Sequence, residues 1–228
     1  MTRARPAKTR KTRAEKTAET RQALMRAAAE VVGEVGYYDA SIARITQRAG
    51  VAQGTFYLYF ENQQELFDQL LPTIGGHLLE DLAERVHGAR NILEVEEAGF
   101  RGFFEFLRQN PSFFRILNEA EVAAPVAHEK HFGILRERYL HALERSWKAG
   151  ELPDYDQQEL EVLAYILMAA RSYLYLRYSK DESGPKPIPE WVVQTFMKFV
   201  RGGFLQGRTS LDESPRQTEG ESRSDDES

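Results

Sequence analysis

Two histidines three residues apart, His128 and His131, have the spacing that comes nearest to a metal site or an active site in this chain. Imidazole nitrogens bind transition metals, and Glu119, Glu121 and Glu129 could add carboxylate ligands. Two histidines on a helix surface are more often solvated than ligating. We therefore expect no metal and no cofactor.

No other signature of catalysis is present in the sequence. We find no glycine-rich phosphate loop, no nucleophile-elbow motif and no His-Glu-x-x-His pair. The chain has no cysteine, which excludes disulfides, thiolate zinc sites and iron–sulfur clusters and fits a reducing cytoplasm. It also has no run of 18 uncharged apolar residues, and its basic N-terminus lacks the apolar segment of a secretory signal. We predict a cytoplasmic protein that neither is an enzyme nor spans a membrane.

Charge is distributed unevenly along the chain. The net charge is −5, but residues 1–72 hold 11 Lys/Arg against 8 Asp/Glu, and the remainder carries a net −8. A basic N-terminal third suits contact with an anion such as nucleic-acid phosphate. Residues 1–17, with Arg10 and Arg13, are predicted to form a disordered basic arm that either follows phosphates or only aids solubility. Residues 206–228 are predicted to form a disordered acidic tail.

Apolar residues recur at helical spacing along the whole chain, and strand patterns are nearly absent. We therefore expect an all-α fold of about nine helices. Ser41 and Asn62 are candidate N-caps, and Pro72 is expected to kink or break the helix that Asn62 opens. Asn110-Pro111 is predicted to supply the N-cap and first residue of a later helix. Further helix starts are predicted at Pro125, Asp156 and Pro189.

Residues 41–67 predict two short helices joined by a tight turn at residues 49–52. Gly50 can adopt the left-handed conformation that such a turn needs. Phe56 and Phe60 lie four residues apart and are expected to pack inward. The residues between and before them are then left on the outer face of the second helix. Such a helix, supported by its predecessor, fits a major groove about 12 Å wide.

This segment resembles the DNA-binding domain of the TetR family of transcriptional regulators. The match spans about residues 20–67 and includes Ile45-Thr46, Ala49-Gly50-Val51-Ala52, Gly54-Thr55-Phe56-Tyr57, Phe60 and Leu66. Ala52 stands where the family often has a small polar N-cap, and Gln63 where a lysine commonly pairs with phosphate. The resemblance implies a helix-turn-helix domain over residues 18–72. It also implies a second helical domain over residues 73–205 that binds a small effector and forms a dimer.

The resemblance also implies which residues contact DNA. Gln53 would read adenine through paired hydrogen bonds, and Leu58 would pack on a thymine methyl group. Hydroxyl groups would bond phosphates, which position the protein rather than specify sequence. The implied DNA-binding residues are Gln53, Gly54, Thr55, Tyr57, Leu58, Tyr59, Arg44, Gln63, Arg10 and Arg13.

Aromatic residues are concentrated in the second domain, where six of the 13 phenylalanines lie between residues 100 and 114. Any single one is best interpreted as ordinary core, but the group indicates an apolar cavity. Arg171 is the only charged residue between positions 162 and 176. It either binds an anionic group of a ligand or pairs with Glu119 or Glu121. The predicted effector pocket comprises Phe100, Phe103, Phe104, Phe114, Leu117, Tyr139, Tyr165, Met168 and Arg171.

Two late segments are predicted to form the dimer interface. Residues 162–170 are apolar all round, which requires burial on more than one side. A second apolar stripe runs from residue 192 to residue 204 at helical spacing. In the TetR family, two such helices from each subunit form a four-helix interface. The predicted interface residues are Val162, Leu167, Leu174, Val192, Phe196, Val200 and Phe204.

The sequence thus indicates a dimeric TetR-like repressor that binds a palindromic operator in double-stranded DNA. A small, largely apolar or aromatic effector would release it, and a fatty acyl thioester or a hydrophobic xenobiotic would fit. One alternative is a helical small-molecule-binding protein whose N-terminal hairpin is only structural. The other is a DNA-binding protein without an effector. The basic arm and the motif argue against the first, and the aromatic-rich second domain argues against the second.

Overall fold

The computed structural model describes residues 12–181 and 183–205, and within these ranges the chain forms nine helices and no strand. The all-α prediction is therefore confirmed. Arg10 and the predicted acidic tail lie outside the described residues. The helices are α1 (Arg13–Asp39), α2 (Ile42–Ala49), α3 (Gln53–Phe56), α4 (Gln63–Val86), α5 (Ile92–Gln109), α6 (Phe113–Ala123), α7 (Pro125–Lys148), α8 (Glu159–Tyr178) and α9 (Glu190–Leu205).

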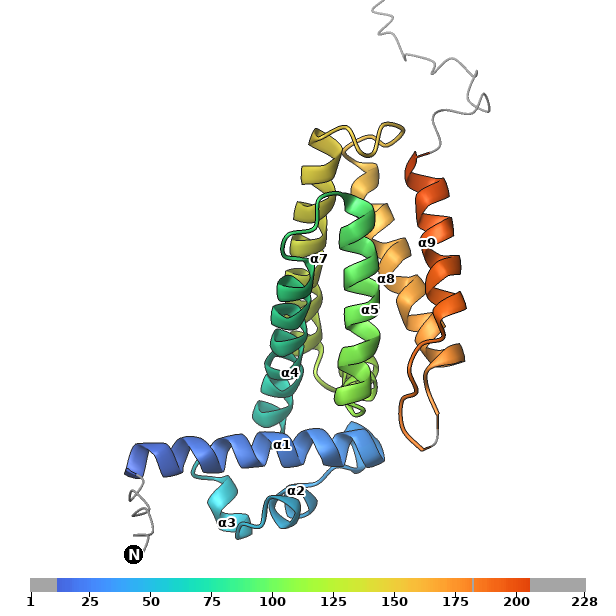
Figure 1. Ribbon diagram of the computed structural model, residues 1–228. Coiled ribbons are helices and arrows are strands. Elements are labelled where there is room, and N and C mark those ends of the chain that lie inside the picture. Colours follow the sequence, from blue (N-terminus) through green and yellow to red (C-terminus); the bar gives the residue numbers. More distant parts are fainter. Residues whose placement is uncertain (1–11, 182, 206–228) are drawn as a thin grey trace, which may run out of the picture.

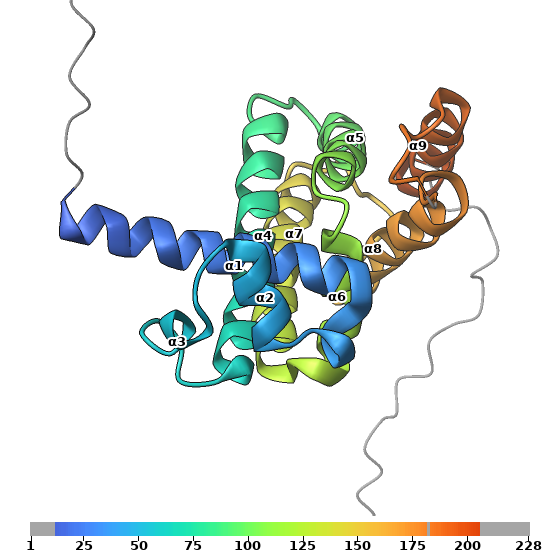
Figure 2. The same cartoon turned by 90° about the horizontal axis from the view of Figure 1, so that it is seen from below.

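The first three helices form one end of the molecule. α1 lies across the base of the longer helices, with α2 and α3 beneath it (Figure 1). α4 leaves α3 and runs upward beside α5 and α7, while α8 and α9 lie on the opposite side of α5 (Figure 1). Seen from below, the N-terminal half of α1 extends beyond the other helices (Figure 2). α4 is therefore the covalent connection between the two parts.

α1 begins earlier than the sequence predicted. Thr12 accepts a hydrogen bond from the backbone N–H of Glu15, and the Glu15 carboxylate accepts one from the N–H of Thr12. This reciprocal capping box starts the helix at Arg13, because both side chains satisfy backbone donors that would otherwise lack partners. Residues 13–17 are thus helical, and the prediction that they belong to a disordered arm was wrong.

The structure confirms some of the predicted helix caps and corrects other predicted helix boundaries. Ser41 and Asn62 cap α2 and α4 through side-chain oxygens that accept from Arg44 and Glu65 N–H groups, respectively. Pro72 does not break α4, which continues to Val86. The helix start predicted at Asn110-Pro111 was wrong, because the Asn110 amide donates to the Phe106 carbonyl and closes α5 instead.

Of the three remaining predicted helix starts, one is confirmed and two differ by a few residues. α7 begins at Pro125 as predicted, and α9 begins at Glu190, directly after Pro189. α6 begins at Phe113, after the turn that contains Pro111. α8 begins at Glu159 rather than beside Asp156, whose backbone N–H donates to the Glu159 carboxylate.

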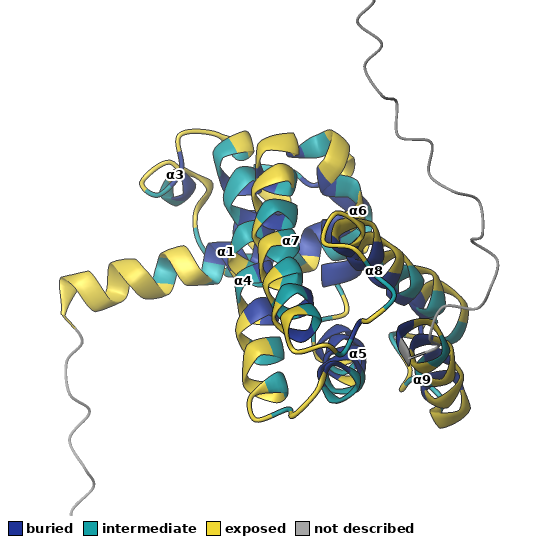
Figure 3. Cartoon of the chain, turned by 90° about the horizontal axis from the view of Figure 1, so that it is seen from above, coloured by how far each residue is buried: buried dark blue, intermediate teal, exposed yellow. Residues whose placement is uncertain are grey.

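A continuous core runs through both parts of the chain, while the outer helix faces are exposed (Figure 3). Phe100 and Phe113 are completely buried in it. α9 packs on α5, where the ring of Phe196 stacks on Phe100 with centroids 4.2 Å apart. None of the helices in the described ranges is both long and apolar enough to cross a membrane.

Candidate nucleic-acid interface and ligand cavity

The turn between α2 and α3 has the geometry that the sequence predicted. Gly50 closes α2 in the left-handed conformation, with φ 69° and ψ 30°. Phe56 and Phe60 are at most 2% exposed, and their ring centroids lie 5.4 Å apart. Ala52 begins α3 without a side-chain hydrogen bond, as expected for a residue that has no polar atom. The two buried rings fix the orientation of α3 against the rest of the domain.

Burial of these rings leaves the other residues of α3 and the following turn facing outward. Leu58 is 79% exposed and Tyr57 is 55% exposed, while Gln53 and Gly54 are also exposed. Thr55 and Tyr59 are half-buried beside them. Amide, hydroxyl and apolar side chains therefore share one outward surface, which is the set of groups that can contact base edges and phosphates.

The other predicted DNA-binding residues differ in their surroundings. Arg13 and Arg44 are exposed. Gln63 is half-buried, and its amide donates to the Ala40 carbonyl over 2.8 Å, which ties the start of α4 to the α1–α2 connection. Arg48, on the outer side of α2, forms ion pairs with Glu34 and Glu30 at 2.7 and 3.1 Å. The hydrogen bonds from Arg48 lower the pKa of Glu34.

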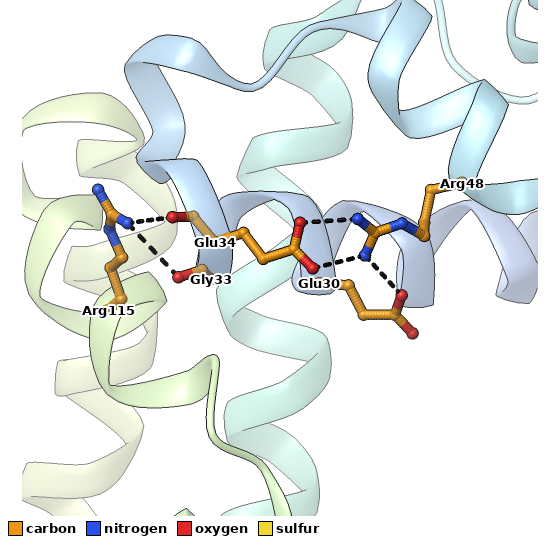
Figure 4. Close-up of polar contacts among 5 residues, drawn as sticks. All are labelled: Glu30, Gly33, Glu34, Arg48 and Arg115. Carbon is orange, nitrogen blue, oxygen red and sulfur yellow. Dashed lines mark hydrogen bonds and ion pairs between the residues drawn. The ribbon is translucent and has the colours of Figure 1, made fainter. Parts of the chain in front are cut away.

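A second polar cluster joins α6 to the end of α1 (Figure 4). Arg115 donates to the carbonyl oxygen of Glu34 over 2.8 Å and lies 3.5 Å from that of Gly33. Its Nε atom also donates to Glu119 over 2.6 Å, and Glu119 accepts from the backbone N–H of Tyr37. Glu34 therefore contacts α6 through its backbone and α2 through its carboxylate. The cluster connects the second part of the chain to the helix-turn-helix.

Close packing reinforces this junction. Gly36 has φ 83°, and a Cβ atom there would lie 2.7 Å from the side chains of Arg115 and Glu119. A Cβ atom on Gly33 would meet the side chain of Ser112 at 2.1 Å. A side chain at position 33 would force α1 away from Ser112, and one at position 36 would strain the backbone at its positive φ. No pattern in the sequence predicted this junction, because the residues that form it are about 80 positions apart.

A cavity of about 600 Å³ lies within the second part of the chain. α4, α5 and α7 supply most of its wall, and α8 contributes Arg171. Its lining combines aliphatic residues, among them Leu79, Leu82 and Val86 of α4, with polar and charged residues of α5, α7 and α8. A concave, mostly apolar cavity with a few polar groups is the usual form of a small-molecule site.

The predicted pocket residues divide between this cavity, the core and the surface. Tyr139 and Arg171 line the cavity. Arg171 pairs with Glu96 at 2.7 Å, so the predicted partners Glu119 and Glu121 were wrong. The remaining predicted residues lie elsewhere. Tyr165 is 49% exposed on α8. Those that do not line the cavity are Phe100, Phe103, Phe104, Phe114, Leu117, Tyr165 and Met168.

The predicted dimer stripe of α9 faces the interior of the chain. The side chains of Val192, Phe196, Val200 and Phe204 are at most 5% exposed. Leu167 is likewise buried, Leu174 is half-buried and Val162 is exposed. A different apolar set lies on the outer surface of these helices, and the sequence analysis named only one of its members as an interface residue. We call it the α8–α9 apolar face: Val162, Tyr165, Ile166, Tyr173, Leu176, Trp191 and Phe199.

His131 is buried rather than solvated. It is 2% exposed and packs against Gly75 of α4 and against Phe113 of α6. Burial, with a smaller contribution from His128, lowers the pKa of His131 to about 4. Among the described residues no group of three or more His, Asp or Glu side chains is placed to hold a metal ion.

The buried rings, the left-handed turn and the outward face of α3 define a helix-turn-helix protein. Residues 24–70 match the family described as bacterial regulatory proteins, tetR family. The likeness to this family thus lies in residues 24–70, which include α2 and α3.

Comparison with known proteins gives the same assignment. An HTH-type transcriptional regulator of unknown role from Bacillus subtilis, YvdT, is 39% identical over 72 residues, which are 32% of this chain and 37% of YvdT. The fatty acid metabolism regulator protein of the same species is 38% identical over 60 residues, 26% of this chain and 31% of the relative. The chain thus matches about a third of the length of each of these relatives.

The likeness in three dimensions extends over most of the chain. The crystal structure of FadR from Bacillus subtilis in complex with stearoyl-CoA aligns with a TM-score of 0.66 at 17% identity. The alignment covers 80% of this chain and 98% of FadR. At this identity, the comparison establishes the shared fold of the second part.

Proposed function

We propose that this protein is a dimeric transcriptional repressor that binds a palindromic operator through α3 and is released by a small, largely apolar effector. The domains proposed for these roles are residues 18–72 and 73–205. The observation that carries the proposal is the outward surface of α3 and of the turn that follows it, where Leu58 is 79% exposed while Phe56 and Phe60 are buried. The tetR-family match of residues 24–70 supports the same conclusion.

Operator recognition follows from the chemistry of that face. Gln53 presents an amide for the edge of adenine, and Leu58 presents an apolar group for a thymine methyl. Tyr57 and Thr55 supply hydroxyl groups for phosphates, and Arg13 and Arg44 supply positive charge. Two copies of α3 in a dimer would enter successive major grooves about 34–36 Å apart, which calls for a palindromic operator.

The cavity is proposed as the effector site. Leu79, Leu82 and Val86 of α4 line it, while the other end of α4 begins beside α3. A ligand that moves α4 would therefore also move the recognition helix relative to its copy in the dimer. It shifts the equilibrium only if it binds the released conformation more tightly than the DNA-bound one. An apolar acyl chain fits the lining, and stearoyl-CoA bound to the FadR structure supports that chemistry.

The α8–α9 apolar face is proposed as the dimer interface. Exposed apolar residues gathered on adjacent helices mark interaction surfaces in soluble proteins. Trp191 and Phe199 are 56% and 64% exposed there, and aromatic anchors dominate the energetics of interfaces. A second copy of the chain would cover this face and form a four-helix contact from two α8 and two α9 helices.

The DNA proposal is tested by Gln53→Ala. Loss of a bidentate contact to adenine costs about 1–3 kcal/mol, which is about 10- to 100-fold in operator affinity. Arg13→Ala is the matched comparison, because it removes a phosphate contact and should weaken all DNA sequences alike. Titration of operator and scrambled DNA distinguishes the two. Equal losses on both DNAs for Gln53→Ala would contradict base recognition by this residue.

A further inference from the structure

One wall of the cavity is formed by a buried ion pair and a tyrosine. Nη2 of Arg171 lies 2.7 Å from a carboxylate oxygen of Glu96, and the two side chains are 9% and 2% exposed. The hydroxyl group of Tyr139 accepts from Arg171 over 2.9 Å and donates to Glu96 over 2.6 Å. The three residues come from α5, α7 and α8, and all of them line the cavity. They form one connected polar group, and Glu137, Arg138, His141 and Arg145 of α7 also line the cavity.

This polar group carries no net charge available to an anion. Glu96 already neutralises Arg171, and the low polarity of the surroundings strengthens repulsion between like charges. A ligand carboxylate placed beside Arg171 would also stand close to Glu96. Burial raises the pKa of Tyr139, so its hydroxyl group stays protonated at neutral pH and keeps its hydrogen bond to Glu96. A negatively charged ligand group is therefore disfavoured directly beside Arg171 and Glu96.

One hydrogen-bond donor of the group has no acceptor. Nε of Arg171 is buried and has no hydrogen-bond partner among the described residues. An unsatisfied buried donor is unfavourable, so an uncharged acceptor that reached it would be favoured. The neighbouring position on α5 is Gly99, where an added Cβ atom would lie 3.7 Å from Nη2 of Arg171. Gly99 thus leaves the guanidinium uncovered on its α5 side.

We infer that the cavity binds an apolar molecule that carries an uncharged carbonyl group, a ketone, ester, thioester or amide, and that Arg171 donates to this carbonyl. The inference rests on the proposed function, since it names the chemical class of the effector at the same site. Glu96 acts as a specificity residue, because its charge decides whether Arg171 prefers a neutral carbonyl or a carboxylate. A free fatty acid is accordingly a poorer ligand than its uncharged derivatives.

The test uses two probes of equal chain length, dodecan-2-one and dodecanoate, with the full-length protein at neutral pH. Each probe competes with the uncharged dye Nile red, whose fluorescence reports occupancy of the apolar cavity. We expect the ketone to displace the dye at a free concentration at least about tenfold below that of dodecanoate, since like-charge contacts are strongly disfavoured. A wild-type protein that prefers dodecanoate, or that binds neither probe, would overturn the inference.

Glu96→Gln supplies the sharper test, because it leaves Arg171 with an uncompensated positive charge. The variant should bind dodecanoate more tightly than the wild type and lose its preference for the ketone. Glu97→Gln is the matched control, since Glu97 follows Glu96 on α5 but pairs with Arg101 and does not line the cavity. The ligand preference of this variant should stay that of the wild type. If Glu96→Gln changed the affinities for the ketone and for dodecanoate by the same factor, Glu96 would not be a specificity residue.

A third variant avoids the ion pair altogether. Gly99→Ala places a methyl group beside Arg171 at ordinary contact distance and should weaken ketone binding while the fold is kept. Unchanged ketone affinity in this variant would count against contact at Arg171. The assay contains no DNA, so ketone binding that leaves operator affinity unchanged would refute the proposed function and not this inference.

Discussion

Removal of Arg115 tests the contact between α6 and the helix-turn-helix. Its hydrogen bond to the Glu34 carbonyl is charge-assisted and half-exposed, and contributes about 1 kcal/mol. The ion pair with Glu119 spans one helical turn at the surface and adds about 0.3–0.5 kcal/mol. Arg115→Met keeps the apolar stem. We therefore expect a loss of about 1.5 kcal/mol, or about 3–6 °C in Tm.

Arg108→Met is the matched control. Arg108 pairs with Glu105 on a single helix and is 46% exposed, against 40% for Arg115, but it makes no contact with α1. Its removal should leave the free energy of unfolding nearly unchanged, because exposed ion pairs contribute little to stability. The difference between the variants, about 1 kcal/mol, is then the contribution of the hydrogen bonds to α1.

Urea unfolding with two probes measures this contribution. Both tryptophans, Trp147 and Trp191, lie in the second part of the chain, whereas circular dichroism reports all helices. In Arg115→Met we expect helical signal to be lost at lower urea than tryptophan fluorescence, because the first three helices have lost an attachment. A destabilisation no greater than that of Arg108→Met, with coincident transitions, would refute the reasoning.

Two further predictions concern pH and assembly. The pKa of His131 is lowered to about 4, so the unfolded state binds the proton more readily between pH 4 and 6.5. Stability should therefore be highest above that window and fall by about 2 kcal/mol from pH 7 to pH 5 in urea titrations. His131→Gln should flatten this slope, His77→Gln should not, and an unchanged slope in His131→Gln would contradict the assignment. Ile166→Glu, on the α8–α9 apolar face, should yield a monomer in sedimentation, whereas Val126→Glu on exposed α7 should not. A wild-type protein that is monomeric at micromolar concentration would refute the proposed dimer.

Local signals in the sequence predicted the helix-turn-helix well. Phe56 and Phe60 lie four residues apart and are both buried, although α3 ends at Phe56, and Gly50 has the backbone freedom that the turn requires. Both features follow from neighbouring residues. The prediction of where α6 starts was wrong, and the reason is also local. Asn110 can cap the end of one helix or the beginning of the next, and the composition of Asn110-Pro111 does not decide between them.

Contacts between distant residues could not be predicted in this way. The partner of Arg171 is Glu96, 75 positions away, and nothing in the sequence sets Glu96 apart from neighbouring acidic residues. The stripe through Val192 and Phe196 correctly indicated a buried face. Periodicity does not say what covers that face, and here it is the chain's own α5. The residues of the α8–α9 apolar face could therefore be identified only from the structure.

The most direct test of the account is binding to operator DNA. Fluorescence anisotropy would compare DNA from the protein's own promoter region with scrambled DNA of equal length across a salt series. The account predicts affinity for the promoter DNA at least about 10³-fold above that for the scrambled DNA. It also predicts that affinity for both falls steeply as salt rises, because phosphate contacts release counterions. Absence of binding to either DNA at low salt would contradict the central claim.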